Sequence, residues 1–332
     1  MIDQAIERIK AANHIVIIQA ENPDGDSLGS ALALEAILGD QAKTITLFCA
    51  IDIPKYLRYL AGWDRVTNAF PYQADCAIIV DTAAEALLVK TLETPAVRNF
   101  LDTHPVVVLD HHGEDESKAS NDLPFEHTFV MSADAAATGE LIYQLATDAG
   151  WQISPDAANT LYASIAADTL GMTTESATSK TFAAVAELVN LGAKPFAVEL
   201  ARRELMKKAP EILAYKGQLI SRIEYLLDGK LAIVHIPFAE IEEYSDKYNP
   251  SVLVLDEMRL VEGVELACAI KTYPDGKLTG KLRGNSPIAA SVAGFFGGGG
   301  HSYAAGFKVF ESYETVIKEL VEATSKSLEK TS

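Results

Sequence analysis

Short apolar runs that end in acidic residues recur through the first third of the chain. Residues 15–18 read IVII, a run too short for a helix and rich in β-branched side chains, which predicts a buried strand of a parallel sheet. An NPDGD turn that contains Asp24 and Asp26 ends the run, and a helical pattern of leucines begins after Ser27. The unit is thus strand, acidic turn and helix.

Two later apolar runs, CAIIVD and VVVLD, end in the same way. The carboxyl ends of parallel strands share one edge of a sheet, and ligands bind there in open α/β folds. The side chains expected at this edge are Asp24, Asp26, Asp81, Asp110, His111 and His112. One strand-end aspartate is commonplace as a helix cap, but three such ends beside a histidine pair favour a site.

The pattern beyond these strands predicts helices and a domain boundary. Residues 44–49 predict another strand, residues 113–126 an exposed acidic loop, and residues 132–145, 157–170 and 179–191 helices. Asp168 lies on an otherwise apolar turn. A carboxylate is costly to bury without a partner, so Asp168 is either exposed or a metal ligand. Residues 192–195, GAKP, break the pattern, and the boundary is placed there.

The second part of the chain mixes helices with hairpin signals. Residues 196–227 are charged and helical, and residues 313–328 form a final amphipathic pattern. Strands are expected at residues 230–236, 266–272, 277–282 and 307–310. The predicted fold is an α/β protein with a parallel-sheet domain (1–193), a linker (194–208) and a smaller α+β domain (209–332).

Composition and charge narrow the function. The net charge of −18 is concentrated in residues 1–193, which hold 10 Lys and Arg against 27 Asp and Glu, whereas residues 194–332 hold 18 against 19. Such a surface disfavours long duplex nucleic acid but allows a short anionic substrate. The N-terminus is no signal peptide, and no apolar run approaches the ~18 residues that span a bilayer, so we expect a cytoplasmic protein without membrane contact.

The acidic edge has the composition of a metal site. Carboxylates with one imidazole and no thiolate suit Mn²⁺ or Mg²⁺ better than zinc. Two such ions ~3.5–4 Å apart can activate water and hold a phosphoryl oxygen. A solvated turn is the alternative for Asp24 and Asp26. In the second domain, the glycines 297–300, His301 and Arg283 could contact phosphate, although each signal alone is weak.

Together these residues resemble the DHH phosphoesterase family, named for the tripeptide at residues 110–112. The resemblance covers NPDGDSLGS, VDTA, LDHH, AATGELIY, AADTLGM, LRG and GGGGHSYAAG, in that order along nearly the whole chain. The last motif is similar to the DHH-associated C-terminal domain, which binds substrate in this family. The chain most resembles the bacterial nano-RNase and pAp phosphatase branch.

The resemblance implies a role for each motif residue. The metal ligands would be Asp24, Asp26, Asp81, His111 and Asp168, with Asp81 bridging two manganese (or magnesium) ions. His112 would contact the scissile phosphate and Asp110 would orient the imidazoles. The substrate would be held by Arg283, Gly299, Gly300 and His301. The implied activity is hydrolysis of short oligonucleotides, dinucleotides or pAp by a hydroxide that two metal ions activate, in a protein that could form a homodimer.

Two positions depart from the family pattern. The histidine of the motif H-x-N-P-D-x-D is replaced by Ala20, which cannot ligate a metal. Glu21 or Gln19 could substitute, with Glu21 preferred on charge, or water could fill the position. After Asp168 the aromatic and arginine of the family are replaced by Met172 and Thr173. A cyclic-dinucleotide phosphodiesterase, or a nucleotide-binding protein with a weakened metal site, are therefore the alternatives.

Overall fold

A computed structural model gives the fold of the chain. It describes residues 1–332 except 113–120, 133 and 332, and for His301 and Thr331 it describes the backbone alone. The chain separates into two compact units, residues 1–207 and 208–332. Helix α8 (Pro195–Met206) occupies most of the expected linker and packs against α6 (Pro155–Asp168), so this segment is part of the first unit.

The first unit is built on a five-stranded sheet with the order β2-β1-β3-β4-β5, in which every strand pair is parallel. The strands are β1 (His14–Gln19), β2 (Thr44–Phe48), β3 (Cys76–Val80), β4 (Val106–Asp110) and β5 (Thr128–Met131). The parallel sheet predicted from the apolar runs is confirmed. Sequence reasoning missed only β5, which follows the expected acidic loop, and residues 113–120 of that loop lie outside the described part of the chain.

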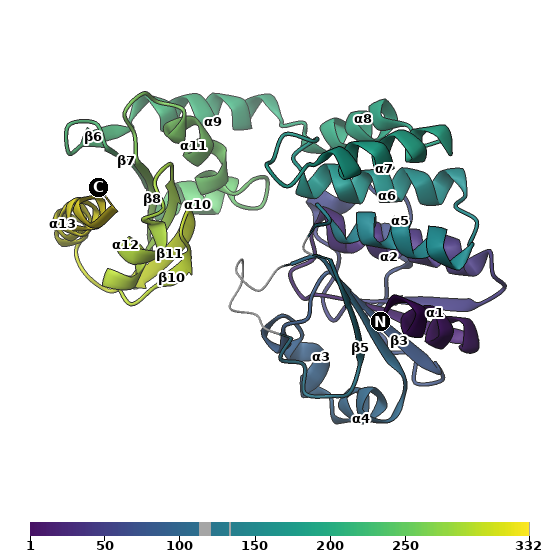
Figure 1. Cartoon of the computed structure of the whole chain (residues 1–332). Coiled ribbons are helices and arrows are strands. Elements are labelled where there is room, and N and C mark those ends of the chain that lie inside the picture. The colour runs from purple at the N-terminus through teal and green to yellow at the C-terminus, as the bar shows by residue number, and fades with distance from the viewer. Residues whose placement is uncertain (113–120, 133, 332) are drawn as a thin grey trace. The chain divides into compact units, whose positions relative to one another are not determined.

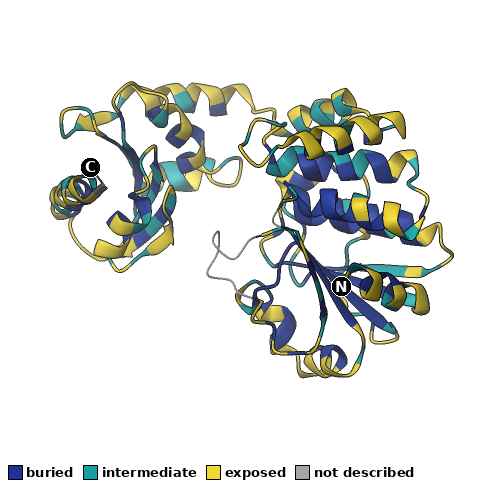
Figure 2. Ribbon diagram, in the orientation of Figure 1, coloured by how far each residue is buried: buried dark blue, intermediate teal, exposed yellow. Residues whose placement is uncertain are grey.

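Helices cover both faces of this sheet (Figure 1). One face carries α1 (Ile2–Ala11), α2 (Gly25–Gly39), α5 (Thr138–Ala149), α6 and α7 (Ser179–Asn190). The other carries α3 (Val89–Glu93) and α4 (Pro95–Thr103), and the connections include the short turns η1 (Lys55–Leu57), η2 (Trp63–Arg65) and η3 (Glu85–Leu87). The central strands β1, β3 and β4 and helix α2 are buried, while α7 and α8 present exposed residues (Figure 2). Burial on both faces explains the continuous apolar runs.

Small residues allow α2, α5 and α6 to pack closely. A Cβ on Gly139 would lie 2.0 Å from Ser164 Oγ, and one on Gly29 would lie 2.9 Å from Ser164 Cβ. The N-terminal turns of α2 and α5 are thereby held against α6. The helix predicted from residue 132 in fact begins at Thr138, because Ala137 is extended. The helix predicted to residue 170 ends at Asp168.

The second unit contains a six-stranded mixed sheet with the order β10-β11-β9-β8-β7-β6, antiparallel except for the parallel pair β7–β8. Its strands are β6 (Glu224–Leu226), β7 (Leu231–Ile236), β8 (Leu266–Thr272), β9 (Leu278–Gly284), β10 (Gly299–His301) and β11 (Ala304–Val309). Helices α12 (Ala289–Phe295) and α13 (Tyr313–Thr331) pack on one face. The other face carries α9 (Pro210–Ser221), α10 (Phe238–Tyr244) and α11 (Pro250–Arg259).

Each unit has its own hydrophobic core. No helix in the described part of the chain combines the length and apolar character that crossing a bilayer requires.

Candidate active site

The acidic residues lie where the order of the parallel sheet reverses. Strand β1 has β2 on one side and β3 on the other, which makes the β1/β3 edge the switch point where ligands bind in this type of sheet. Asp24 and Asp26 follow β1 and Asp81 follows β3. His111 and His112 follow the adjacent strand β4, and Asp168 ends α6.

Asp26 is held rigidly in the first turn of α2. Its side chain is fully buried and accepts hydrogen bonds from Thr138 N (2.7 Å), Gly139 N (3.2 Å) and Ser30 Oγ (3.0 Å), with Ser164 Oγ as a further donor. Two of these donors are the free amides at the N-terminus of α5, which favour a negative charge. The carboxylate is therefore fixed before any ligand arrives.

Asp81 adopts an unusual backbone conformation at the end of β3. Its φ of 63° lies in the left-handed region, which aspartate tolerates better than most residues. Thr138 Oγ1 donates to its Oδ1 at 2.9 Å. Burial, reinforced by the charges of Asp26 and Asp24, raises the pKa of Asp81 well above its ordinary value. Close carboxylates of this kind repel unless a cation or a proton lies among them.

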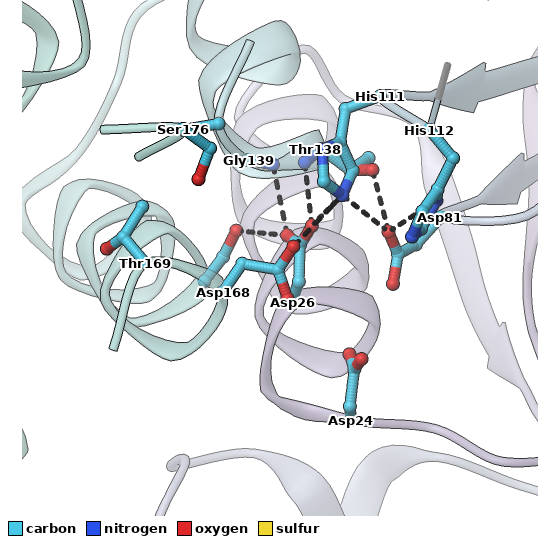
Figure 3. Close-up of polar contacts among 12 residues, drawn as sticks. Asp24, Asp26, Asp81, His111, His112, Thr138, Gly139, Asp168, Thr169 and Ser176 are labelled. Carbon is cyan, nitrogen blue, oxygen red and sulfur yellow. Dashed lines mark hydrogen bonds and ion pairs between the residues drawn. The ribbon is translucent and has the colours of Figure 1, made fainter. Parts of the chain in front are cut away.

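His111 stands at the centre of these acids. Its Nε2 lies 3.0 Å from Asp168 Oδ2, 3.6 Å from Asp26 Oδ2 and 3.7 Å from Asp81 Oδ1, as Figure 3 shows. Burial alone would lower the pKa of His111, but the contact with Asp168 and the surrounding negative charges outweigh it and raise that pKa to about 9. The carboxylates of Asp26, Asp81 and Asp168 thus lie around the His111 imidazole.

His112 has a different environment. Asp110 Oδ1 lies 2.7 Å from His112 Nδ1 and also accepts the His112 backbone N–H at 3.2 Å. This hydrogen bond raises the pKa of His112 in spite of burial. The ring is 41% exposed and its centroid is 4.3 Å from that of His111. Asp110 therefore orients His112. The sequence predicted that Asp110 would contact both imidazoles, but among the described hydrogen bonds and ion pairs it contacts that of His112 alone.

Asp24 stands apart from the other acids. It caps α2 by accepting Ser27 N at 2.9 Å, and in Figure 3 it lies below the bonded group. Burial raises the pKa of Asp24, with smaller contributions in the same direction from Asp26 and Asp168, against the hydrogen bond from Ser27. The pKa of Asp81, its expected partner in the first metal position, is raised for the same reasons.

The arrangement fits divalent cations. Two overlapping groups of ligand atoms, Asp26–His111–Asp168 and Asp81–His111–His112, each lie within metal-binding range. Within the described ion pairs, no lysine or arginine neutralises these carboxylates. The donors are mostly carboxylate oxygens with imidazole, a set that suits manganese or magnesium.

The structure shows whether Glu21 is available to replace the histidine that is missing at position 20. Glu21 Oε1 accepts the Thr91 N–H at 2.8 Å, so the carboxylate preferred as a replacement for the missing histidine is engaged by the first turns of α3. Ala20 is buried and contributes no donor atom from its side chain. After Asp168, the residues Leu170, Gly171 and Met172 all have positive φ, which turns the chain sharply beside the site.

The residues expected to bind phosphate lie on the sheet of the second unit. Arg283 is on β9 and pairs in register with Ala304, which pairs in turn with His301, so these three stand in one row across the sheet. The side chain of His301 lies outside the described residues. Gly300 has a φ of 140° and packs against Ala304 O at a distance where no Cβ fits. Gly299 pairs with Gly306 at the sheet edge.

Sequence reasoning missed the residues that hold Asp26. The motif AATGELIY contains Thr138 and Gly139, but their contribution is largely through backbone N–H groups, which leave no signature in the side-chain pattern. Ser164 in SIAAD carried a weak signal, because a serine on a buried helical turn needs a partner.

Comparison with known proteins agrees with this geometry. Residues 14–165 match the family model described as DHH family, N-terminal domain. These residues are therefore similar to the N-terminal domain of the DHH family, in agreement with the resemblance that the motifs carry.

Individual relatives extend the likeness to the rest of the chain. The chain is 22% identical over 310 residues to the bifunctional oligoribonuclease and PAP phosphatase NrnA of Bacillus subtilis (strain 168), covering 92% of this chain and 93% of that protein. It is 24% identical over 319 residues to a probable NrnA of the same description from Streptococcus mutans, covering 95% and 96%. The crystal structure of an exopolyphosphatase-related protein from Bacteroides fragilis has the same fold, with a TM-score of 0.80 at 21% identity, and covers 98% of this chain and 95% of that one.

Proposed function

We propose that this protein is a manganese-dependent phosphoesterase that hydrolyses short oligoribonucleotides, including dinucleotides, and 3′-phosphoadenosine 5′-phosphate. The observation that carries the proposal is the convergence of Asp26, Asp81 and Asp168 on His111 Nε2, within 3.0–3.7 Å. The names of the relatives that match over nearly the whole chain support the substrate class.

The residues of the site have distinct roles in this proposal. Asp24 and Asp81 would hold one ion, and Asp26, Asp81, His111 and Asp168 the other. When bound, such ions polarise a phosphoryl oxygen and lower the pKa of a water molecule. Asp110 fixes His112 through Nδ1, which leaves Nε2 of this half-exposed ring to contact the phosphate and hold a proton there.

The second unit offers a surface for the anionic substrate. Lys271, Lys281 and Lys308 line a cavity of about 610 Å³ together with glycines of the 297–306 segment, and none of the described residues that line it is acidic. The register of β8, β9 and β11 places Lys271, Thr279 and Lys308 in one row across the sheet. Burial, and then the charge of Lys281, lowers the pKa of Lys271. Like charges gathered without a carboxylate favour binding of phosphates.

A substrate panel with the purified protein tests the proposal. With Mn²⁺ present, we expect hydrolysis of the dinucleotide pApA to mononucleotides and release of phosphate from 3′-phosphoadenosine 5′-phosphate. EDTA and Asp81→Ala should each abolish both activities. Turnover of cyclic dinucleotides in preference to pApA would favour the cyclic-dinucleotide alternative. Equal turnover in EDTA would contradict metal dependence.

Ala20 favours a second candidate function, a nucleotide-binding protein whose metal site is too weak for catalysis. In that case Ala20→His should raise the rate by orders of magnitude. If the rate is unchanged, another group already completes the site.

A further inference from the structure

We propose that the side-chain amide oxygen of Gln19 replaces the missing histidine ligand in the first metal position, beside Asp24 and Asp81. This inference rests on the proposed metal-dependent function and specifies how its first ion is held. It starts from one observation. The Gln19 side chain is fully buried, and both Oε1 and Nε2 lack a hydrogen-bond partner among the described residues.

Gln19 lies next to the chain segments that carry Asp81 and Asp24. Gln19 is the last residue of β1 and pairs in register with Val80, the residue directly before Asp81. It shares the sheet face of Ile15 and Ile17, because side chains two apart point the same way. That face is covered by α2, whose N-cap is Asp24.

Neither of the two residues that follow Gln19 can supply the missing metal ligand. Ala20 has no donor atom, and Glu21 is bound to Thr91 N. Ser27 Oγ, in the first turn of α2, is the other buried polar atom of this segment without a partner in the described chain. A buried amide is rarely left unpaired, so a water molecule or a cation must satisfy it. The repelling carboxylates Asp24 and Asp81 make a cation the partner that relieves both problems.

An amide oxygen in place of an imidazole nitrogen should change which metal ions the first position prefers. Imidazole suits Zn²⁺ and Ni²⁺, whereas carbonyl and carboxylate oxygens suit Mg²⁺ and Mn²⁺. With Gln19 as a ligand, the first position should discriminate less between Mg²⁺ and Mn²⁺ than an imidazole site does. Ala20→His in a Gln19→Leu background should restore Mn²⁺ binding and shift the preference toward Ni²⁺.

Binding of Mn²⁺ to the metal-free full-length protein, without substrate, tests the inference. Electron paramagnetic resonance counts free Mn²⁺, and calorimetry gives the affinity of each ion. We expect two ions in the wild-type protein. Gln19→Leu should weaken one of them at least about 10-fold and leave the other unchanged. Gln19→Glu should bind that ion more tightly, since it adds a negative charge.

Stability of the metal-free variants separates a ligand from a merely structural residue. Removing an unpartnered amide should leave the unfolding temperature of metal-free Gln19→Leu unchanged or raise it, while its rise on adding Mn²⁺ shrinks. Gln152→Leu, at an exposed position of the same unit, is the matched control and should bind Mn²⁺ as the wild type does.

The outcomes distinguish this inference from the proposed function. Two ions bound with wild-type affinities by both Gln19→Leu and Gln19→Glu would overturn the role of Gln19 and leave the metal-dependent function intact. Failure of the wild-type protein to bind any Mn²⁺ would overturn both. If Gln19→Leu does not fold, Gln19→Glu decides, because a buried carboxylate that gains no Mn²⁺ affinity contradicts the proposal.

Discussion

Gly139 is the residue at which helix packing and the site are joined most tightly. Its N–H donates to Asp26, and a Cβ there would lie 2.0 Å from Ser164 Oγ. We expect Gly139→Ala to push α5 away from α6 and to lower the free energy of unfolding by about 1–3 kcal/mol. Urea unfolding measures this, and Mn²⁺ affinity should fall in parallel because Asp26 loses its fixed position.

Gly39 provides a control for this substitution. It also lies in a helix, has no unusual φ and has nothing within 4 Å of its added Cβ. Gly39→Ala should leave stability unchanged or raise it by up to about 1 kcal/mol. If both alanine variants unfold alike, close contact of α5 with α6 is not what requires glycine at 139.

Asp110→Asn should separate catalysis from metal binding. Asp110 holds the His112 ring and belongs to neither group of metal-ligating atoms. An asparagine can offer its NH₂ to Nδ1 and so stabilise the wrong tautomer. We expect kcat to fall at least about 100-fold, within the range for general acid–base residues, while the number of bound Mn²⁺ ions stays at the wild-type value. Loss of Mn²⁺ along with activity would contradict this division of roles.

At the scale of elements, the strand ends of β3 and β4 make the stability of the metal-free protein depend on pH. The pKa of His111 is raised from 6.5 to about 9, so its proton stabilises the fold fully below pH 6.5 and that stabilisation is lost as pH rises to 9. The raised pKa of Asp81 acts in the same direction. We expect the metal-free protein to unfold at a lower temperature at pH 9 than at pH 6.5.

Metal reverses this pH trend, because ligands must lose their protons to bind it. The rise in unfolding temperature on adding Mn²⁺ should therefore grow between pH 6.5 and pH 9. Thermal unfolding with EDTA and with Mn²⁺ at both values measures the difference. His111→Gln is the control: it should flatten the metal-free trend, and an unchanged slope in this variant would assign the dependence to other groups.

The elements also show what sequence could predict. The strands β1, β3 and β4 were found because local β-branched runs and acidic ends are visible in the chain, and a parallel sheet brings those ends together. The start of α5 was wrong by six residues, since alanines at 135–137 fit a helix as well as a turn. The contacts of Asp26 with Thr138, Gly139 and Ser164 join residues more than a hundred positions apart and depend on helix packing that no local pattern encodes.

At the scale of the whole molecule, the two units differ in net charge as well as in fold. Most of the net negative charge lies in the first unit, which holds 14 Lys and Arg against 29 Asp and Glu, and cations would relieve it there. The second unit holds 14 against 17, with lysines gathered on one face of its sheet. Metal binding and substrate binding should therefore respond to different substitutions. Lys281→Ala should weaken binding of pApA and leave Mn²⁺ affinity unchanged, whereas Asp81→Ala should do the reverse.

The salt dependence of pApA affinity tests whether the lysines of the second unit contact the phosphates. A lysine that contacts a phosphate releases a counterion on binding, so the slope of log affinity against log salt reports the number of such contacts. Binding of pApA to the inactive Asp81→Ala protein, titrated at several salt concentrations, should show a slope that drops by about one when Lys281→Ala is added. Lys318→Ala, on exposed α13 over the opposite face of the sheet, should leave that slope unchanged. Equal slopes for all three proteins would place the phosphate contacts elsewhere than on this lysine face.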